Sequence, residues 1–143
     1  MKKILLIILK YIVLYVVYGS IYFLIECFWK GKITDISMFI LSGFLGISVG
    51  LINNLFSWDT SFILQCFTGT LLATLSEAII GIEFLNRGIH VWSYETLPLS
   101  FCNGTINLFF SIAWFILCGI AIILDDYLRY WFFKEEKPRY KLF

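Results

Sequence analysis

The sequence predicts an all-α, polytopic membrane protein built as a bundle of about four transmembrane helices. Apolar residues make up 60% of the 143-residue chain, charged residues make up only 15%, and the mean hydropathy is +0.87. An average soluble domain has about 45–50% apolar and about 25% charged residues. This chain therefore has too little polar surface to cover a water-soluble globule. Many aromatic residues also stand at the ends of apolar runs, where amphipathic rings favour the membrane–water boundary.

Four apolar runs are long enough to cross a bilayer, which takes about 20 helical residues. They cover residues 8–28, 36–56, 61–84 and 101–124. Each run is expected to be a helix, because lipid leaves no backbone polar group unpaired and four such segments cannot close a barrel. Residues 1–124 thus form the predicted transmembrane domain. Residues 125–143 alternate aromatic and charged side chains, which predicts a cytoplasmic, amphipathic and basic tail at the membrane surface.

The distribution of basic residues predicts the orientation. Lysine and arginine concentrate near the two termini, at Lys2, Lys3, Lys10, Arg129, Lys134, Lys137, Arg139 and Lys141. Because basic residues favour the cytoplasmic side and an even number of spans puts both ends on one side, both termini are expected in the cytoplasm and the protein in the plasma membrane. Lys30 and Lys32 in the first loop run against this bias. The formal net charge of +1 comes with no basic stripe, so no nucleic-acid partner is expected.

Two acidic residues lie inside the predicted spans. An acid in the bilayer costs about 2.5–3.5 kcal/mol on insertion scales, so each needs a physical reason. Glu77 shares one face of the third span with small and hydroxylated residues, namely Thr70, Ala73, Thr74 and Gly81. Glu26 lies near the outer end of the first span, with Gly19 and Tyr22 on the same face. Since the first and third helices run in the same direction, both acids fall in the outer half of the membrane.

Asparagines of the fourth predicted span lie at the same membrane level. Asn103, Asn107 and Ser111 form one helical stripe there, beneath a long loop that contains Trp92 and Tyr94. The sequence therefore predicts an outer-half polar pocket for a substrate or ion, built by Glu77, Glu26, Asn107, Asn103, Tyr94 and Trp92. The alternative is structural: Glu77 and the asparagines form hydrogen bonds between helices, and Glu26 reaches the outer headgroups.

Small residues line one face of the second span. Gly43, Gly46 and Gly50 follow one another at spacings of three and four, and Asn53 and Ser57 continue the stripe. Small residues let helix backbones approach closely, so these glycines and Gly81 are predicted to pack against other helices. A mobile, pore-lining face is the functional alternative.

The sequence contains no catalytic or cofactor-binding motif. Its four cysteines form no C-x-x-C pair, and its one histidine, His90, lies in a loop, so no metal site is predicted. No phosphate-binding loop, nucleophile elbow or HExxH motif is present, so neither an enzyme nor a cofactor is expected. If ATP drives transport, the ATPase is another polypeptide.

Two blocks of residues carry a resemblance to a known family. The first comprises Ser37-Met38-Phe39, Gly43, Gly50-Leu51-Ile52-Asn53, Glu77 and Gly81. The second comprises Trp92-Ser93-Tyr94, Pro98, Gly104, Ile106-Asn107-Leu108, Ser111 and Trp114. Together they resemble the ABC-transporter type IV permease family of bacteria, over roughly residues 18–131. The resemblance implies a permease without naming its substrate. The family usually has acids where this sequence has Ser93 and Asn54, so no acid-dependent role is carried over there.

These observations favour an integral membrane transport component, a permease subunit whose outer-half pocket is centred on Glu77. Its expected partners are the lipid bilayer and either further copies of the chain, as a homo-oligomer, or a separate ATPase or membrane subunit. Small size, the glycine stripe and the basic tail leave open a self-assembling homo-oligomeric channel or holin-like pore. A third alternative is a membrane scaffold or regulatory subunit that transports nothing, in which both acids are structural.

Overall fold

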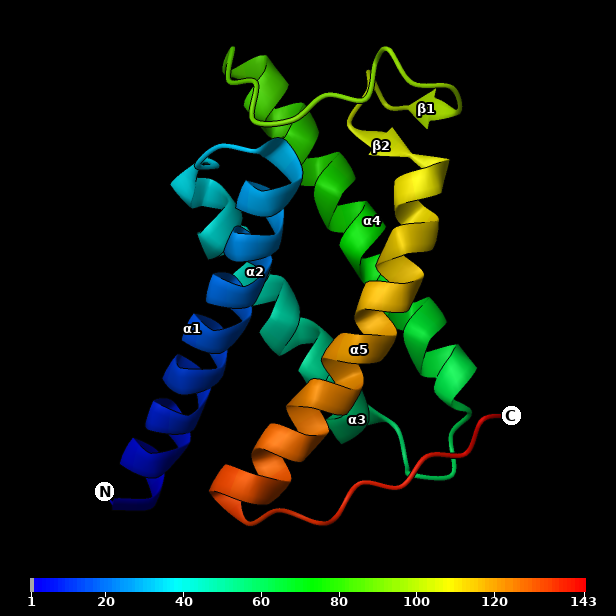
Figure 1. Ribbon diagram of the computed structural model, residues 1–143. Coiled ribbons are helices and arrows are strands. Elements are labelled where there is room, and N and C mark those ends of the chain that lie inside the picture. The colour runs from blue at the N-terminus through cyan, green and yellow to red at the C-terminus, as the bar shows by residue number, and fades with distance from the viewer. Residues whose placement is uncertain (1) are drawn as a thin grey trace.

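The computed structural model describes residues 2–143, apart from the side chains of Lys2 and Asn53 (Figure 1). The predicted place of Asn53 on the glycine stripe therefore lies outside the described residues. The long helices are α1 (Lys2–Lys30), α4 (Phe62–Asn86) and α5 (Leu108–Phe133). All three are long and apolar enough to cross a membrane. The predicted all-α class is thus confirmed, and a shorter helix, α2 (Ile36–Gly50), packs against α1.

The helices form two antiparallel hairpins, α1 with α2 and α4 with α5 (Figure 1). The two hairpins meet each other mainly through α2 and α5, and the contacts within each hairpin are more extensive. Both termini lie at one end of the molecule, which we call the terminal end. The opposite end, where residues 87–107 connect α4 to α5, is called the loop end.

The second predicted span is divided in the structure. Helix α2 ends at Gly50, Leu51 separates it from the single turn α3 (Ile52–Leu55), and the backbone at Leu51 stays near helical values. The 15 residues of α2 alone reach about 22 Å, whereas the hydrocarbon core is about 30 Å thick. Glycine has low helix propensity, which explains a break beside Gly50. At its other end α2 begins at Asp35, whose carboxylate accepts a hydrogen bond of 2.8 Å from the Ser37 N–H. Hydrogen bonds from Ser37 lower the pKa of Asp35.

The fourth predicted span is displaced along the chain, so its predicted bounds were wrong. Residues 101–107 are not helical: the strands β1 (Ser100–Phe101) and β2 (Ile106–Asn107) pair as a small antiparallel hairpin. Its turn holds Cys102, Asn103 and Gly104 at positive φ, which a helix does not allow. Helix α5 begins only after Asn107, whose side-chain oxygen accepts a hydrogen bond of 2.9 Å from the Phe109 N–H. It then continues to Phe133.

The predicted tail is largely ordered. Residues 125–133 belong to α5. Within this part of the helix, Asp125 and Arg129 are buried and form an ion pair. The chain then turns at Lys134 and runs back along the terminal end to the start of α4. There the Phe62 N–H donates to the Lys141 carbonyl at 2.7 Å, and the Tyr140 hydroxyl donates to Asp126 at 2.8 Å.

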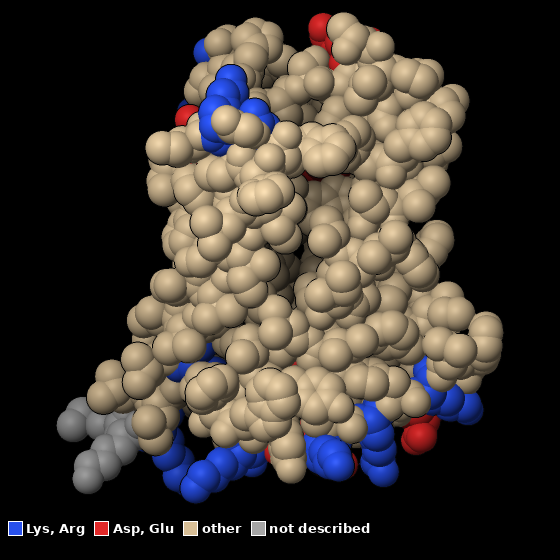
Figure 2. All heavy atoms as spheres, viewed as in Figure 1, with Lys and Arg blue, Asp and Glu red and all other residues tan. Residues whose placement is uncertain are grey.

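The surface between the two ends is apolar. Large apolar side chains on every long helix are more than half exposed, among them Leu5, Leu24, Phe67, Ile79, Ile116 and Ile120. Figure 2 shows this belt almost free of charged residues, with lysine and arginine gathered along the terminal end. Such a continuous exposed apolar surface suits a lipid environment and not water. The best-packed core lies between α2, α3, α4 and α5 and includes Val49, Ile52, Cys66, Ala73, Cys118 and Ile122.

The glycines of α2 lie where neighbouring side chains leave no room for a Cβ. A Cβ at Gly43 would lie 2.7 Å from the Tyr15 ring, and one at Gly46 would lie 2.3 Å from the Tyr18 ring. A Cβ at Gly50 would lie 2.5 Å from the carboxylate carbon of Asp125 on α5. The stripe thus allows α2 to approach both α1 and α5.

Replacing Gly50 by alanine is expected to destabilise the protein by about 1–3 kcal/mol, the usual cost of overpacking, because the buried Asp125 carboxylate must move. Thermal unfolding of the purified protein in a mild detergent would measure the loss. Ser48→Ala on the exposed side of α2 is the matched control and is expected to be nearly neutral. Equal unfolding temperatures for Gly50→Ala and the control would contradict the close approach of α2 and α5.

Candidate functional site

A cavity of about 520 Å³ lies at the loop end, between the two hairpins and under the connecting loop. Helix α1 contributes Tyr22 and Glu26, α4 contributes Glu77, and α5 contributes Phe110 and Trp114. The loop contributes Trp92 and Tyr94. Four of the six residues predicted for the pocket, Glu26, Glu77, Trp92 and Tyr94, therefore line one space.

Glu77 is the acid at the centre of this cavity. Its side chain is buried on α4, where Ala73 and Gly81, one turn away on either side, are also buried. One carboxylate oxygen, Oε1, accepts a hydrogen bond of 3.3 Å from the Tyr94 hydroxyl. The other oxygen, Oε2, is buried and has no hydrogen-bond partner among the residues that the structure describes. Glu77 thus lines the cavity with a carboxylate of which one oxygen is hydrogen-bonded and the other is buried without a partner.

Glu26 differs because it has a cation of its own. Its Oε2 lies 2.6 Å from the Lys30 Nζ, one helical turn along α1, and its Oε1 accepts a longer bond of 3.4 Å from the Tyr22 hydroxyl. Lys30 also donates to the Thr34 hydroxyl at 3.0 Å. Lys30, which runs against the charge bias of the sequence, therefore neutralises one of the two acids and leaves Glu77 without a cationic partner.

Aromatic rings form most of the cavity wall. Tyr22 stacks on Trp114 with ring centres 5.4 Å apart, and Tyr94 stacks on Phe110 at 4.6 Å. Trp29 meets the edge of Phe110 at 6.4 Å. Burial and the nearby carboxylate of Glu77 raise the pKa of Tyr94 above its usual range, so its hydroxyl keeps the proton that it donates. Tyr22, Trp29, Phe110 and Trp114 were missed as site residues, although their helical positions facing Glu77 were a usable signal.

The two asparagines do not line the cavity. Asn103 was predicted on a helical stripe, but it lies in the exposed turn of the β1–β2 hairpin at a φ of 55°. Asn107 is fully buried, and its Nδ2 donates to the Pro98 carbonyl at 2.8 Å and to the Ser100 hydroxyl at 2.9 Å. All its polar atoms hold the loop to the start of α5, so Asn107 positions the loop and has no group left for a ligand.

The loop is also held against α4. The Trp92 indole N–H donates to the Thr105 carbonyl at 3.2 Å. A Cβ at Gly81 would lie 2.7 Å from the Thr105 side chain, so only glycine allows the hairpin this close to α4. These contacts fix Trp92 above Glu77.

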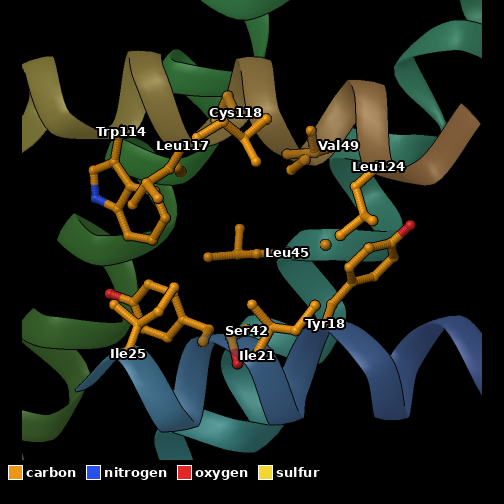
Figure 3. Close-up of a pocket in the computed structure, with 15 residues that line it drawn as sticks. Tyr18, Ile21, Ile25, Ser42, Leu45, Val49, Trp114, Leu117, Cys118 and Leu124 are labelled. Carbon is orange, nitrogen blue, oxygen red and sulfur yellow. The ribbon is translucent and has the colours of Figure 1, made fainter. Parts of the chain in front are cut away.

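A second, apolar cavity of about 120 Å³ adjoins the first and extends toward the terminal end (Figure 3). Both cavities share the same four wall residues, Tyr22, Ile25, Trp114 and Leu117. Leu45 of α2 points into the middle of the space, and Tyr18 and Leu124 stand at its far end (Figure 3).

A buried polar cluster lies beyond that far end. The Tyr18 hydroxyl of α1 donates to Asp125 Oδ1 at 2.5 Å, and the Arg129 Nε donates to Asp125 Oδ2 at 2.5 Å. Asp125 is fully buried. We call Tyr18, Asp125 and Arg129 the terminal cluster. Sequence reasoning missed it because residues 125–133 were read as an interfacial tail, although an acid and an arginine four residues apart are a helical ion-pair signal.

Further charged contacts surround the terminal cluster. Lys10 of α1 pairs with Glu135, and Arg129 Nη1 lies 3.9 Å from Glu135. The Arg129 guanidinium also lies 5.7 Å from the centre of the Tyr11 ring. Side chains of α1 and of the α5 end thus bridge the two hairpins at the terminal end.

The protein thus has three helices that are long and apolar enough to cross a membrane. An acidic cavity with aromatic walls lies at the loop end, and a buried polar cluster lies at the terminal end. No protein-family model, curated protein or solved structure matches the chain. Within residues 2–143 no group of three or more His, Cys, Asp or Glu side chains could hold a metal ion. The chemistry available in the loop-end cavity is that of the Glu77 carboxylate, the paired Glu26 and Lys30, hydroxyl groups of tyrosine and serine, and several aromatic rings.

Tyr18→Phe is expected to destabilise the protein by about 1.5–3 kcal/mol, since it removes a hydrogen bond to a buried, charged acceptor. Tyr15→Phe is the matched control, because its hydroxyl donates to the Ile40 carbonyl within one hairpin and is exposed. Thermal unfolding in the same detergent would compare them. A Tyr18→Phe protein as stable as the control would show that the terminal cluster does not tie the hairpins together.

Proposed function

We propose that the protein is an integral membrane transport component that binds a monovalent cation at Glu77. The observation that carries the proposal is the carboxylate of Glu77, which lines a cavity walled by aromatic rings and whose buried Oε2 has no hydrogen-bond partner among the described residues. Insertion of an acid costs about 2.5–3.5 kcal/mol in a bilayer, and a bound cation would offset that cost.

The cavity favours an organic cation over a metal ion. A cation within about 6 Å of an aromatic ring centre is attracted by the ring face, by about 2 kcal/mol or more when desolvated. Tyr22, Trp92, Tyr94, Phe110 and Trp114 line the cavity together with Glu77, and in each of the two stacked pairs every ring keeps one face that its partner does not cover. Calcium and magnesium instead take six or more oxygen ligands, and among the described residues no group of three or more His, Cys, Asp or Glu side chains could hold a metal ion. An organic ammonium group can be bound by one carboxylate together with several aromatic rings.

The proposed topology has four crossings, with α2 and α3 acting as one. Residues 36–55 follow a nearly helical path and would reach about 30 Å. The basic side chains of the terminal end support a cytoplasmic position for both termini in a plasma membrane. In this orientation the cavity lies in the outer half of the bundle, under the loop, and the terminal cluster closes the cytoplasmic side. This closure favours a permease over a permanently open pore.

Glu77→Gln is expected to weaken cation binding by at least about tenfold, or about 1.4 kcal/mol, because the amide keeps the shape of the acid and loses its charge. Equilibrium dialysis of radiolabelled tetramethylammonium against the purified protein would measure the change. Glu95→Gln, in the exposed part of the same loop, is the matched control and should bind normally. Equal binding by both variants would refute the site. A Glu77→Gln protein that no longer unfolds cooperatively would support the structural alternative, in which Glu77 joins helices.

Energy coupling is tested by isolating the tagged protein from its native host in mild detergent, followed by mass spectrometry of the associated proteins. We expect a stoichiometric ATPase, since the chain has no nucleotide-binding motif of its own. A homo-oligomer that purifies alone and conducts ions in planar bilayers would contradict the permease proposal in favour of a self-assembling channel. A stable partner whose own activity depends on this chain, without any transport, would favour a scaffold.

A further inference from the structure

The apolar cavity of Figure 3 lies directly against the proposed cation site. Tyr22, Ile25, Trp114 and Leu117 form a wall of both spaces, so a ligand with its charge at Glu77 can extend past these residues toward Leu45. A cavity of about 120 Å³ thus lies between the loop-end cavity and the terminal cluster, beside the packed core.

This second space offers almost nothing to a hydrated ion. It has three hydroxyl groups in its wall, and all are already engaged: Ser42 donates to the Met38 carbonyl at 2.5 Å, Tyr18 donates to Asp125, and Tyr22 donates to Glu26 at 3.4 Å. The other wall residues are apolar or aromatic, apart from a cysteine. Cavities of this kind stay dry and accept apolar molecules.

The apolar cavity also has a route to the lipid. Its walls come from α1, α2 and α5, and the backbones of α1 and α5 stand apart and are bridged by large side chains such as the stacked Tyr22 and Trp114. Figure 2 shows a hollow in the face of the molecule at this level, between the half that contains α1 and the half that contains α5. A ligand could enter there from the bilayer without crossing water.

We infer that the ligand of this protein is an amphipathic cation, with an ammonium group at Glu77 and an apolar chain in the cavity beside Leu45. The inference rests on the proposed cation site and adds the substrate class. The free carboxylate oxygen matches the positive charge, the rings match an ammonium group, and the dry apolar space that opens to lipid matches a hydrocarbon chain. A small hydrophilic cation would leave that space empty, and an anionic amphiphile would meet the unpaired Glu77.

The test is a chain-length series in lipid nanodiscs that contain only phosphatidylglycerol, whose headgroup has no ammonium. Unlabelled alkyltrimethylammonium ions, from methyl to dodecyl, compete with radiolabelled tetramethylammonium for the wild-type protein. We expect apparent affinity to rise by about twofold to fourfold for each added methylene until the cavity is full. Leu45→Trp should flatten this dependence by filling the space, while tetramethylammonium still binds.

Three controls make the result specific. Ala121→Leu fills the same space from α5 and replaces Leu45→Trp if that variant does not fold. Comparison of wild type with these variants removes the effect of partitioning into the bilayer, which is the same for all. Alkyl sulfonates of equal chain length should not compete. Adding phosphatidylcholine to the nanodiscs separates two sources of the same chemistry: competition assigns the ammonium group to a lipid headgroup, and its absence assigns it to a free amphiphile.

The possible outcomes separate the inference from the proposed function. If tetramethylammonium binds through Glu77 but affinity does not change with chain length, the amphiphile inference is overturned and the cation site stands. If affinity rises equally in wild type and in both cavity-filling variants, the chain does not occupy this cavity and the inference also fails. If no cation binds at all, both fail together. Only a length dependence that the filled cavities abolish supports the inference.

Discussion

The rest of the structure depends on the hydrogen bonds that the buried Asp125 carboxylate accepts. This carboxylate accepts hydrogen bonds from Tyr18 of α1 and Arg129 of α5 and lies against Gly50 of α2, so it joins both hairpins at one point. In lipid, apolar contacts provide little drive for helices to associate, and hydrogen bonds and close packing carry more of the interaction. Removing one partner from a buried pair costs about 3–5 kcal/mol, since the other charge is left uncompensated.

Fixing the hairpins at the terminal end allows them to separate elsewhere. Toward the loop end, α1 and α5 are bridged only by large side chains, and the space between them becomes two adjoining cavities. The loop closes this space from above because Asn107 holds it to α5 and Trp92 holds it to the hairpin. The two acids of the cavity differ in their charge partners. Lys30 neutralises Glu26 within one helix, whereas Glu77 lines the cavity without a cationic partner among the described residues.

The sequence predicts those features that depend on length and composition. Helices α1 and α4 follow from long apolar runs, and the burial of Glu77 follows from the small residues on its face of α4. Length and composition do not predict the break at Leu51 or the β1–β2 hairpin, although Asn103-Gly104 in the hairpin is a recognised turn signal. They arise from local backbone chemistry, namely a glycine at the break and the capping asparagine Asn107. Asp125 and Arg129 are charged residues of the kind expected at a membrane surface. The tertiary fold buries them, and this burial cannot be predicted from composition.

The facing sides of α1 and α5 carry residues of both the loop-end cavity and the terminal cluster. Tyr18, Tyr22 and Glu26 lie one turn apart along a single face of α1, and Trp114 and Asp125 are the corresponding positions on α5. A rotation of α1 against α5 would therefore change the stacked wall of the cavity and the Tyr18–Asp125 hydrogen bond together. In the proposed transport function, ligand binding at the loop end and closure at the terminal end would thus be connected through α1 and α5, as access that alternates between the two sides requires.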